Sequence, residues 1–223
     1  MDAKIDGVIF DFDGTLVDTY RLYVETYRQV LTDFLGKDLS AADVTDMQLK
    51  AEIRFFLDAP YREDYEHLYQ AFINHYGRRH AELCDGPYPG AFAAVDAIQD
   101  RGLVTGLVTG KSRAAYDISV DRTGAPQFAV SVCDDDVNLP KPDPEGIIRA
   151  CQLLQVDPKK ILYVGDSQVD FEAAQNAGSY FAGVLWAKDD REQLEFRELC
   201  EGSPRTRLVS EPAGLLEFLD APG

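Results

Sequence analysis

Apolar residues gather in short runs along the chain, and each run ends at a small or polar residue. β-Branched and aromatic residues dominate these runs, which lack a clean period of two, as is typical of strands buried on both faces. The runs that we predict as strands span residues 8–10, 104–108, 128–132, 161–164 and 180–185.

Helix-like segments lie between these runs in the second half of the chain. We predict helices over residues 91–100, 113–122, 146–154 and 171–177. The last of them closes at Gly178, a residue type suited to a helix C-terminus. Strands that alternate with helices indicate an α/β fold with a doubly wound parallel sheet and a Rossmann-type core.

Residues 20–85 follow a different pattern, with apolar positions spaced by three and four and no strand-like runs. This spacing predicts three or four amphipathic helices inserted after the first strand. A turn-rich segment at 85–90 leads back to the sheet. We therefore expect a core domain made of residues 1–17 and 86–223, and an α-helical cap domain of residues 18–85.

The C-terminal tail is charged just after residue 190 and apolar at Leu215, Leu216 and Leu219. This pattern predicts a peripheral helix. No internal repeat is visible in the chain.

Composition narrows the classes of function. The 223 residues are 45% hydrophobic and 27% charged, as in ordinary globular proteins. The net charge of −17 disfavours nucleic acid and anionic membranes as partners. The four cysteines form no C-x-x-C pair, and no long apolar run follows the polar N-terminus, so we expect a cytoplasmic protein without a zinc site or a disulfide framework.

Chemically reactive residues stand where the predicted strands end. Asp11 and Asp13 follow the first strand, Thr109 follows the second, and Asp166 follows a later one, with Asp170 four positions on. In open α/β sheets, ligands bind at these carboxyl ends. Clustered carboxylates favour a hard cation such as Mg²⁺, which would offset their repulsion.

Lys141 lies in the segment LPKPDP, where prolines restrict the backbone. A lysine, a hydroxyl and free backbone amides beside a cation make a pocket suited to phosphate. A carboxylate in such a pocket can attack phosphorus and form an aspartyl-phosphate.

Four motifs together resemble one family. DFDGT at 11–15, Thr109 after an apolar strand, KPDP at 141–144 and GDSQVD at 165–170 resemble the haloacid dehalogenase (HAD) superfamily of phosphatases. The resemblance extends from residue 5 to residue 190, and the helical insert lies where that family carries a helical cap. It implies a HAD-like hydrolase acting on a small phosphorylated metabolite.

The resemblance also implies catalytic roles. Asp11 would be the nucleophile, and Asp13 would protonate the leaving oxygen and then activate water. Thr109 and the amide of Gly110 would bind phosphoryl oxygens, and Lys141 would neutralise the charge that grows during transfer.

For the metal, the resemblance implies that Asp11, Asp166 and the carbonyl of Asp13 ligate Mg²⁺, with Asp170 supporting the site through water. Asp13 also favours phosphoryl transfer over dehalogenation, because the dehalogenases lack an acid at that position.

The substrate is less defined. The helical cap, GDSQVDFEAAQNAG and AGVLWA at 182–187 look most like phosphoglycolate phosphatases and pyrophosphatase-type relatives. Many relatives have Asn where this chain has Gly110, which removes a side chain that could meet substrate or cap. Lys50 and Arg54, four residues apart, are candidates to reach a substrate carboxylate or second phosphate.

Other interpretations stay open. A β-phosphoglucomutase-like transferase would use the same core, but the expected histidine is missing at the start of the cap. A binding module with the fold but no catalysis is a further alternative, against which the intact acidic motifs argue. A phosphonate-cleaving relative would need a Schiff-base lysine in the cap, for which Lys50 is the one candidate. The oligomeric state stays open as well.

Two further segments suggest ligand sites at first sight. GLVTGKS at 106–112 lacks the spacing of a P-loop, because three residues rather than four separate Gly106 from the Gly–Lys pair. The three acids at 134–136 are predicted to form a surface turn rather than a second metal site.

Overall fold

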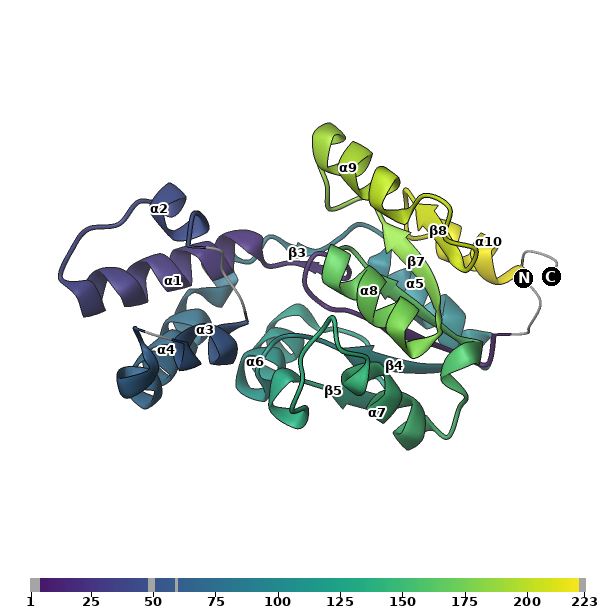
Figure 1. Ribbon diagram of the computed structural model, residues 1–223, viewed down its shortest axis with the longest axis horizontal. Helices are drawn as coiled ribbons and strands as arrows, with labels where there is room; N and C mark the ends of the chain where they lie inside the picture. The colour runs from purple at the N-terminus through teal and green to yellow at the C-terminus, as the bar shows by residue number, and fades with distance from the viewer. Residues whose placement is uncertain (1–4, 48–50, 59, 221–223) are drawn as a thin grey trace.

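The computed structural model describes residues 5–47, 51–58 and 60–220 (Figure 1). Its main body is a six-stranded sheet of order β5-β4-β1-β6-β7-β8, in which all neighbouring strands are parallel. The strands are β1 (Gly7–Phe10), β4 (Val104–Val108), β5 (Val130–Val132), β6 (Ile161–Gly165), β7 (Tyr180–Val184) and β8 (Thr206–Val209). The doubly wound α/β fold predicted from the sequence is confirmed.

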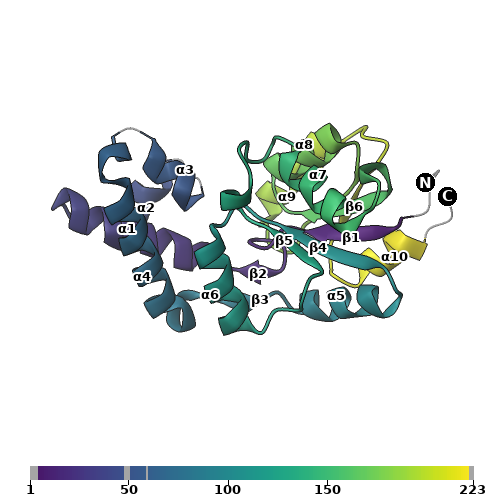
Figure 2. The same cartoon turned by 90° about the horizontal axis from the view of Figure 1, so that it is seen from below.

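Helices cover both faces of this sheet (Figure 2). They are α5 (Ala91–Asp100), α6 (Arg113–Thr123), α7 (Glu145–Leu154), α8 (Gln168–Ala177), α9 (Asp190–Cys200) and α10 (Gly214–Asp220). In β1, Val8 and Phe10 join a hydrophobic cluster with α5 and α10, whereas Ile9 joins another with α7, α8 and α9. Both faces of the strand are buried, which explains its continuous apolar run.

Some element ends differ from the prediction. The strand expected over 128–132 begins at Val130, and the helix expected over 171–177 begins at Gln168. Ser167 caps this helix: its Oγ accepts from the amide of Asp170, whose carboxylate accepts from the amide of Ser167 at 3.1 Å. This capping box holds Asp170 in the first turn of α8.

The peripheral helix predicted for the C-terminal tail corresponds to α10, and the tail also contains two elements that the sequence pattern does not predict. The tail contains α9, the edge strand β8 and then α10. Two short 3₁₀ helices, η2 (Asp134–Asp136) and η3 (Pro158–Lys160), lie elsewhere in the main body. An edge strand has one partner and need not be apolar on both faces. β8 is half-exposed and carries Arg207, so it lacks the signal of the central strands.

The segment after β1 folds into helices that lie beside the sheet (Figure 1). These are α1 (Tyr20–Leu35), α2 (Ala41–Thr45), α3 (Glu52–Leu57) and α4 (Tyr65–Leu83), with the short 3₁₀ helix η1 (Arg62–Asp64), and we call α1–α4 the cap helices. Five of their aromatic side chains are buried in one cluster, and others pack against it partly buried; the five are Tyr27, Phe55, Phe56, Phe72 and Tyr76.

Two short antiparallel strands, β2 (Val17–Asp18) and β3 (Gly86–Pro87), connect the cap helices to the body. The predicted domain boundaries, 17/18 and 85/86, fall at this connection and stay predictions. No helix in the described part of the chain combines the length and the apolar composition needed to cross a bilayer.

Candidate active site

Three central strands end in polar residues that lie together. Asp11 follows β1, Thr109 follows β4 and Asp166 follows β6. The amide of Asp11 donates to the carbonyl of Val164 at 2.8 Å, and that of Thr109 donates to the carbonyl of Val132 at 3.0 Å. These bonds extend the sheet ladders, so a rigid backbone presents the side chains at the carboxyl edge of the sheet, where ligands bind in open α/β folds.

Lys141 lies between two buried carboxylates. Its Nζ donates to Oδ1 of Asp11 at 2.8 Å and to Oδ1 of Asp170 at 2.6 Å. The hydroxyl of Tyr163 lies 3.3 Å from the same nitrogen and donates to Oδ1 of Asp170 at 3.0 Å. The structure thus joins three of the residues singled out in the sequence, although Lys141 and Asp11 are 130 positions apart.

Burial dominates the electrostatics of this cluster. It raises the pKa of Asp11 well above its usual value, although Lys141 opposes the rise. Burial also raises the pKa of Asp166 to about 6, and repulsion from Asp170 adds to the effect. Asp170 behaves differently: burial disfavours its charge, but Lys141 holds its pKa below the usual value. Lys141, together with Lys188 beside Asp166, therefore does not offset all the carboxylates of the cluster.

This excess of negative charge suits a divalent cation. Asp11, Asp166 and Asp170 each offer an oxygen, and these atoms lie within 4.8 Å of one another. Oxygen donors in such a cluster match the preference of hard cations such as Mg²⁺. The side chain of Asp13 is outside this group, so its expected contribution through the backbone carbonyl stays a prediction.

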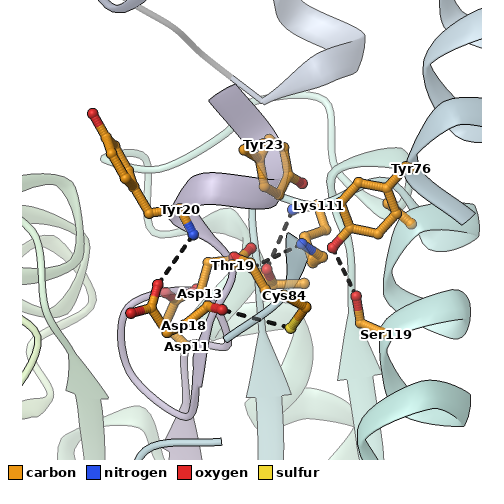
Figure 3. A network of polar contacts seen from close by, with 12 residues as sticks. Asp11, Asp13, Asp18, Thr19, Tyr20, Tyr23, Tyr76, Cys84, Lys111 and Ser119 are labelled. Atoms are coloured by element: carbon orange, nitrogen blue, oxygen red, sulfur yellow. Dashed lines mark hydrogen bonds and ion pairs between the residues drawn. The ribbon is translucent and has the colours of Figure 1, made fainter. Parts of the chain in front are cut away.

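The carboxylate of Asp13 is held by two hydrogen-bond donors that do not belong to the group of candidate metal ligands (Figure 3). The Nζ of Lys111 donates to its Oδ1 at 2.8 Å, and the hydroxyl of Thr19 donates to the same oxygen. The turn after Asp13 needs Gly14, whose φ is +72° and whose added Cβ would lie 2.6 Å from Oδ2 of Asp166. The turn therefore passes close to the candidate metal ligands.

The predicted phosphate-binding residues lie at the end of β4. Thr109 is buried, and its Oγ1 accepts from the amide of Lys111 at 3.2 Å. Thr109 is not the N-cap of the next helix, because Ser112 takes that role for α6. A Cβ added to Gly110 would meet one described atom within 4 Å, the Cβ of Ala51 at 3.8 Å. The position therefore has room for a side chain, and the glycine leaves that space next to the cap helices.

A cavity of about 760 Å³ lies between the cap helices and this edge of the sheet. Four cations of the described chain line it, and each has a carboxylate oxygen within 3.3 Å: Arg21, Lys111, Lys141 and Lys188. Lys188 lies 3.3 Å from Oδ2 of Asp166, and no motif in the sequence singled it out. The sequence places Lys111 after Thr109 and Gly110 at a strand end, in a segment that lacks the spacing of a P-loop, and it gives this lysine no role in the site.

The two cap residues predicted to set specificity have different outcomes. Lys50 lies outside the described residues. The guanidinium of Arg54 binds the main body: its Nε lies 2.9 Å from Oδ2 of Asp134, and its Nη2 donates to the carbonyl of Val137 at 3.1 Å. A role of Arg54 in substrate selection stays a prediction.

The acids at 134–136 form the expected turn, but only Asp135 is exposed on the surface. They make the 3₁₀ helix η2, in which the side chain of Asp134 is 1% exposed and Asp136 pairs with Arg113 at 2.7 Å. A buried carboxylate needs a partner. Arg54 in α3 is that partner. Only the tertiary structure reveals this pairing.

A second contact docks the same helix. Glu52, fully buried in α3, accepts from the amide of Ser112 at 2.9 Å and from the hydroxyl of Tyr23 at 3.0 Å. An anion at the N-terminus of α6 is favoured by the helix dipole. Glu52 and Arg54 together hold α3 against the loops that follow β4 and β5.

We expect Arg54→Ala to raise KM about 5- to 30-fold, with a smaller change in kcat. The reason is that about 1–2 kcal/mol of docking free energy is lost, so less of the protein has its cap helices in place for substrate. Steady-state kinetics with a small phosphate ester would measure this.

Arg79→Ala is the matched control, because it breaks an exposed ion pair with Glu82 within α4. It should leave KM unchanged. An unchanged KM in Arg54→Ala would show that this contact has no part in substrate binding.

Comparison with known proteins agrees with the geometry. A family model described as haloacid dehalogenase-like hydrolase matches residues 8–184. The pyrophosphatase PpaX of Bacillus velezensis is 32% identical over 188 residues, which cover 83% of this chain and 85% of that protein. The N-acetylmuramic acid 6-phosphate phosphatase of Pseudomonas aeruginosa is 31% identical over 191 residues, covering 82% and 83%.

Among solved structures, CbbY from Rhodobacter sphaeroides in complex with phosphate has a TM-score of 0.78. It covers 97% of this chain and 100% of its own, at 22% sequence identity. At that identity the likeness concerns the fold, which includes both the sheet and the cap helices.

Proposed function

This chain belongs to the haloacid dehalogenase-like hydrolase family and is a phosphatase of small phosphorylated substrates, and we propose that it works with Mg²⁺ through an aspartyl-phosphate on Asp11. The observation that carries the proposal is the position of Asp11. It lies at the end of β1, beside the cation Lys141 and within reach of the carboxylates of Asp166 and Asp170.

The first half-reaction forms the intermediate. The substrate phosphoryl group would bind the hydroxyl of Thr109 and the amide of Gly110, with Lys141 offsetting its charge. An oxygen of Asp11 attacks phosphorus as the bond to the leaving oxygen breaks. Asp13 gives that oxygen a proton, so an alcohol leaves and the phosphoryl group stays on Asp11.

The second half-reaction restores the enzyme. Asp13, now ionised, accepts a proton from water as the water oxygen attacks phosphorus. The bond between phosphorus and the Asp11 oxygen breaks, and inorganic phosphate leaves. Held by Asp11, Asp166 and the carbonyl of Asp13, with Asp170 in support, Mg²⁺ would supply positive charge beside the phosphoryl oxygens.

We propose a phosphorylated metabolite of the cytoplasm as substrate, with phosphoglycolate as the first compound to test. The cavity of about 760 Å³ has room for a small ester. Its cap side is the part that would select the leaving group, because the strand ends would hold the phosphoryl group alone.

The proposal is tested by phosphate release from phosphoglycolate, pyrophosphate, hexose phosphates and an aryl phosphate. We expect turnover with Mg²⁺, a loss of at least about 100-fold with chelator, and recovery when Mg²⁺ is added back. Phosphate release that is unchanged by chelator would contradict the metal dependence. No release from any compound by folded protein would contradict the phosphatase and direct attention to phosphoryl transfer.

A further inference from the structure

Lys111 is an unusual residue for the interior of a protein. It follows Thr109 and Gly110 in the loop after β4, and its side chain is 0% exposed. Its Nζ donates to Oδ1 of Asp13 at 2.8 Å, across 98 residues of sequence. A fully buried ammonium is costly unless it is paired. Its partner here is the carboxylate to which we assign the proton transfers.

Aromatic rings complete the surroundings of this ammonium (Figure 3). The Nζ of Lys111 lies 4.2 Å from the ring centroid of Tyr23, 4.9 Å from that of Tyr76 and 5.8 Å from that of Phe12. Ring faces attract cations and replace part of the lost hydration. Tyr23 belongs to α1 and Tyr76 to α4, so the cap helices build this half of the site.

Hydrogen bonds hold both tyrosines in place. The hydroxyl of Tyr76 lies 2.8 Å from Oγ of Ser119 in α6, and that of Tyr23 donates to Glu52 at 3.0 Å. Burial by itself would lower the pKa of Lys111, but Asp13, with further negative groups nearby, raises it above the usual value. The site is therefore built to hold a charged lysine.

The contacts on Asp13 are uneven. Lys111 and Thr19 both donate to Oδ1. No group in the described part of the chain donates to Oδ2, and the side chain is 31% exposed at the cavity. One oxygen is thus anchored, while the other is free to meet a ligand.

We propose that Lys111 is a positioning residue for Asp13, and that the cap helices complete its site. By anchoring Oδ1, the ammonium presents Oδ2 to the leaving oxygen of the substrate. When the cap helices move away, the rings of Tyr23 and Tyr76 leave the lysine, and the anchor loosens. The proposal rests on the proposed role of Asp13 as acid and base.

The test is Lys111→Met, which keeps the length and apolar stem of the side chain. Alcohol release is measured in a single turnover, which isolates the first half-reaction, with an alkyl phosphate and with p-nitrophenyl phosphate. We expect the rate to fall about 10- to 100-fold with the alkyl ester and less than about threefold with the aryl ester. The alkoxide needs a proton to leave, whereas the nitrophenolate does not.

A double-mutant cycle with Asp13→Asn separates positioning from a general structural effect. If Lys111 acts through Asp13, Lys111→Met should cause no further loss in the Asp13→Asn background. Lys159→Met, an exposed lysine in η3, is the control and should behave as wild type.

Thr19→Val tests the same anchor if Lys111→Met fails to fold, because it removes the second donor to Oδ1 with little change in shape. It should show the same preference for the aryl ester. Equal losses on both esters, or additive losses with Asp13→Asn, would overturn the proposal. Absence of turnover in the wild type would instead overturn the phosphatase mechanism itself.

Discussion

Asp11→Asn should abolish phosphate release, with a loss of about 10⁴-fold or more in kcat. The substitution keeps the shape of the side chain but removes the oxygen nucleophile, so no aspartyl-phosphate can form. Folding should survive, because burial already raises the pKa of Asp11 and Lys141 keeps Asp170 as a partner at 2.6 Å. Steady-state release of phosphate, beside a denaturant unfolding curve, measures both effects.

Asp6→Asn is the matched control for this prediction. Asp6 lies just before β1, at the opposite end of the strand from Asp11, and pairs with Lys160 on the surface at 3.3 Å. The same chemical change there should leave kcat within about twofold of wild type. If Asp11→Asn retained a tenth of the wild-type rate, Asp11 would not be the nucleophile.

Lys141→Met should have the second largest effect, on both stability and turnover. It leaves the buried carboxylates of Asp11 and Asp170 without their shared cation. Removing one partner of a buried ion pair costs about 3–5 kcal/mol of unfolding free energy. We also expect kcat to fall about 10²- to 10³-fold, because charge on the phosphoryl oxygens is no longer offset.

The two effects of Lys141→Met should separate when Mg²⁺ is added. A bound cation can replace the lost charge for the carboxylates, so part of the stability should return. Turnover should not return, because the metal does not occupy the position of the lysine. Lys160→Met, in an exposed ion pair, should change stability by less than about 0.5 kcal/mol.

The pH dependence of stability in metal-free protein follows from Asp166, whose pKa burial raises to about 6. At Asp166 the folded state then binds more protons than the unfolded state between about pH 4 and 6. The stability that Asp166 contributes is therefore lost as the pH rises through that window, whereas buried His80, whose pKa is lowered to about 4, contributes in the opposite direction. Unfolding curves of wild type and Asp166→Asn at several pH values would isolate the contribution of Asp166, and equal slopes with pH in the two proteins would contradict the arrangement of charges.

The sequence by itself determined the fold class and the edge of the sheet at which the candidate site lies. Parallel strands buried on both faces leave continuous apolar runs, and the polar residues that end those runs must meet at one edge. The positions of Asp11, Thr109 and Asp166 directly after such runs were therefore enough to place them together. The helix at 91–100 was also predicted with the ends that α5 has in the structure.

Tertiary structure alone decided the partners of buried charges. Lys111 looks like a loop lysine in the sequence, and Asp134 looks like part of an acidic turn. Their burial depends on Asp13 and on Arg54, which are 98 and 80 positions away, and on rings from two cap helices. The edge strand β8 was missed for a related reason, since it has one neighbour and no apolar run. Local periodicity indicates which face of an element is buried. Whether a charged side chain is buried depends instead on partners that are distant in the sequence, and no local pattern reveals them.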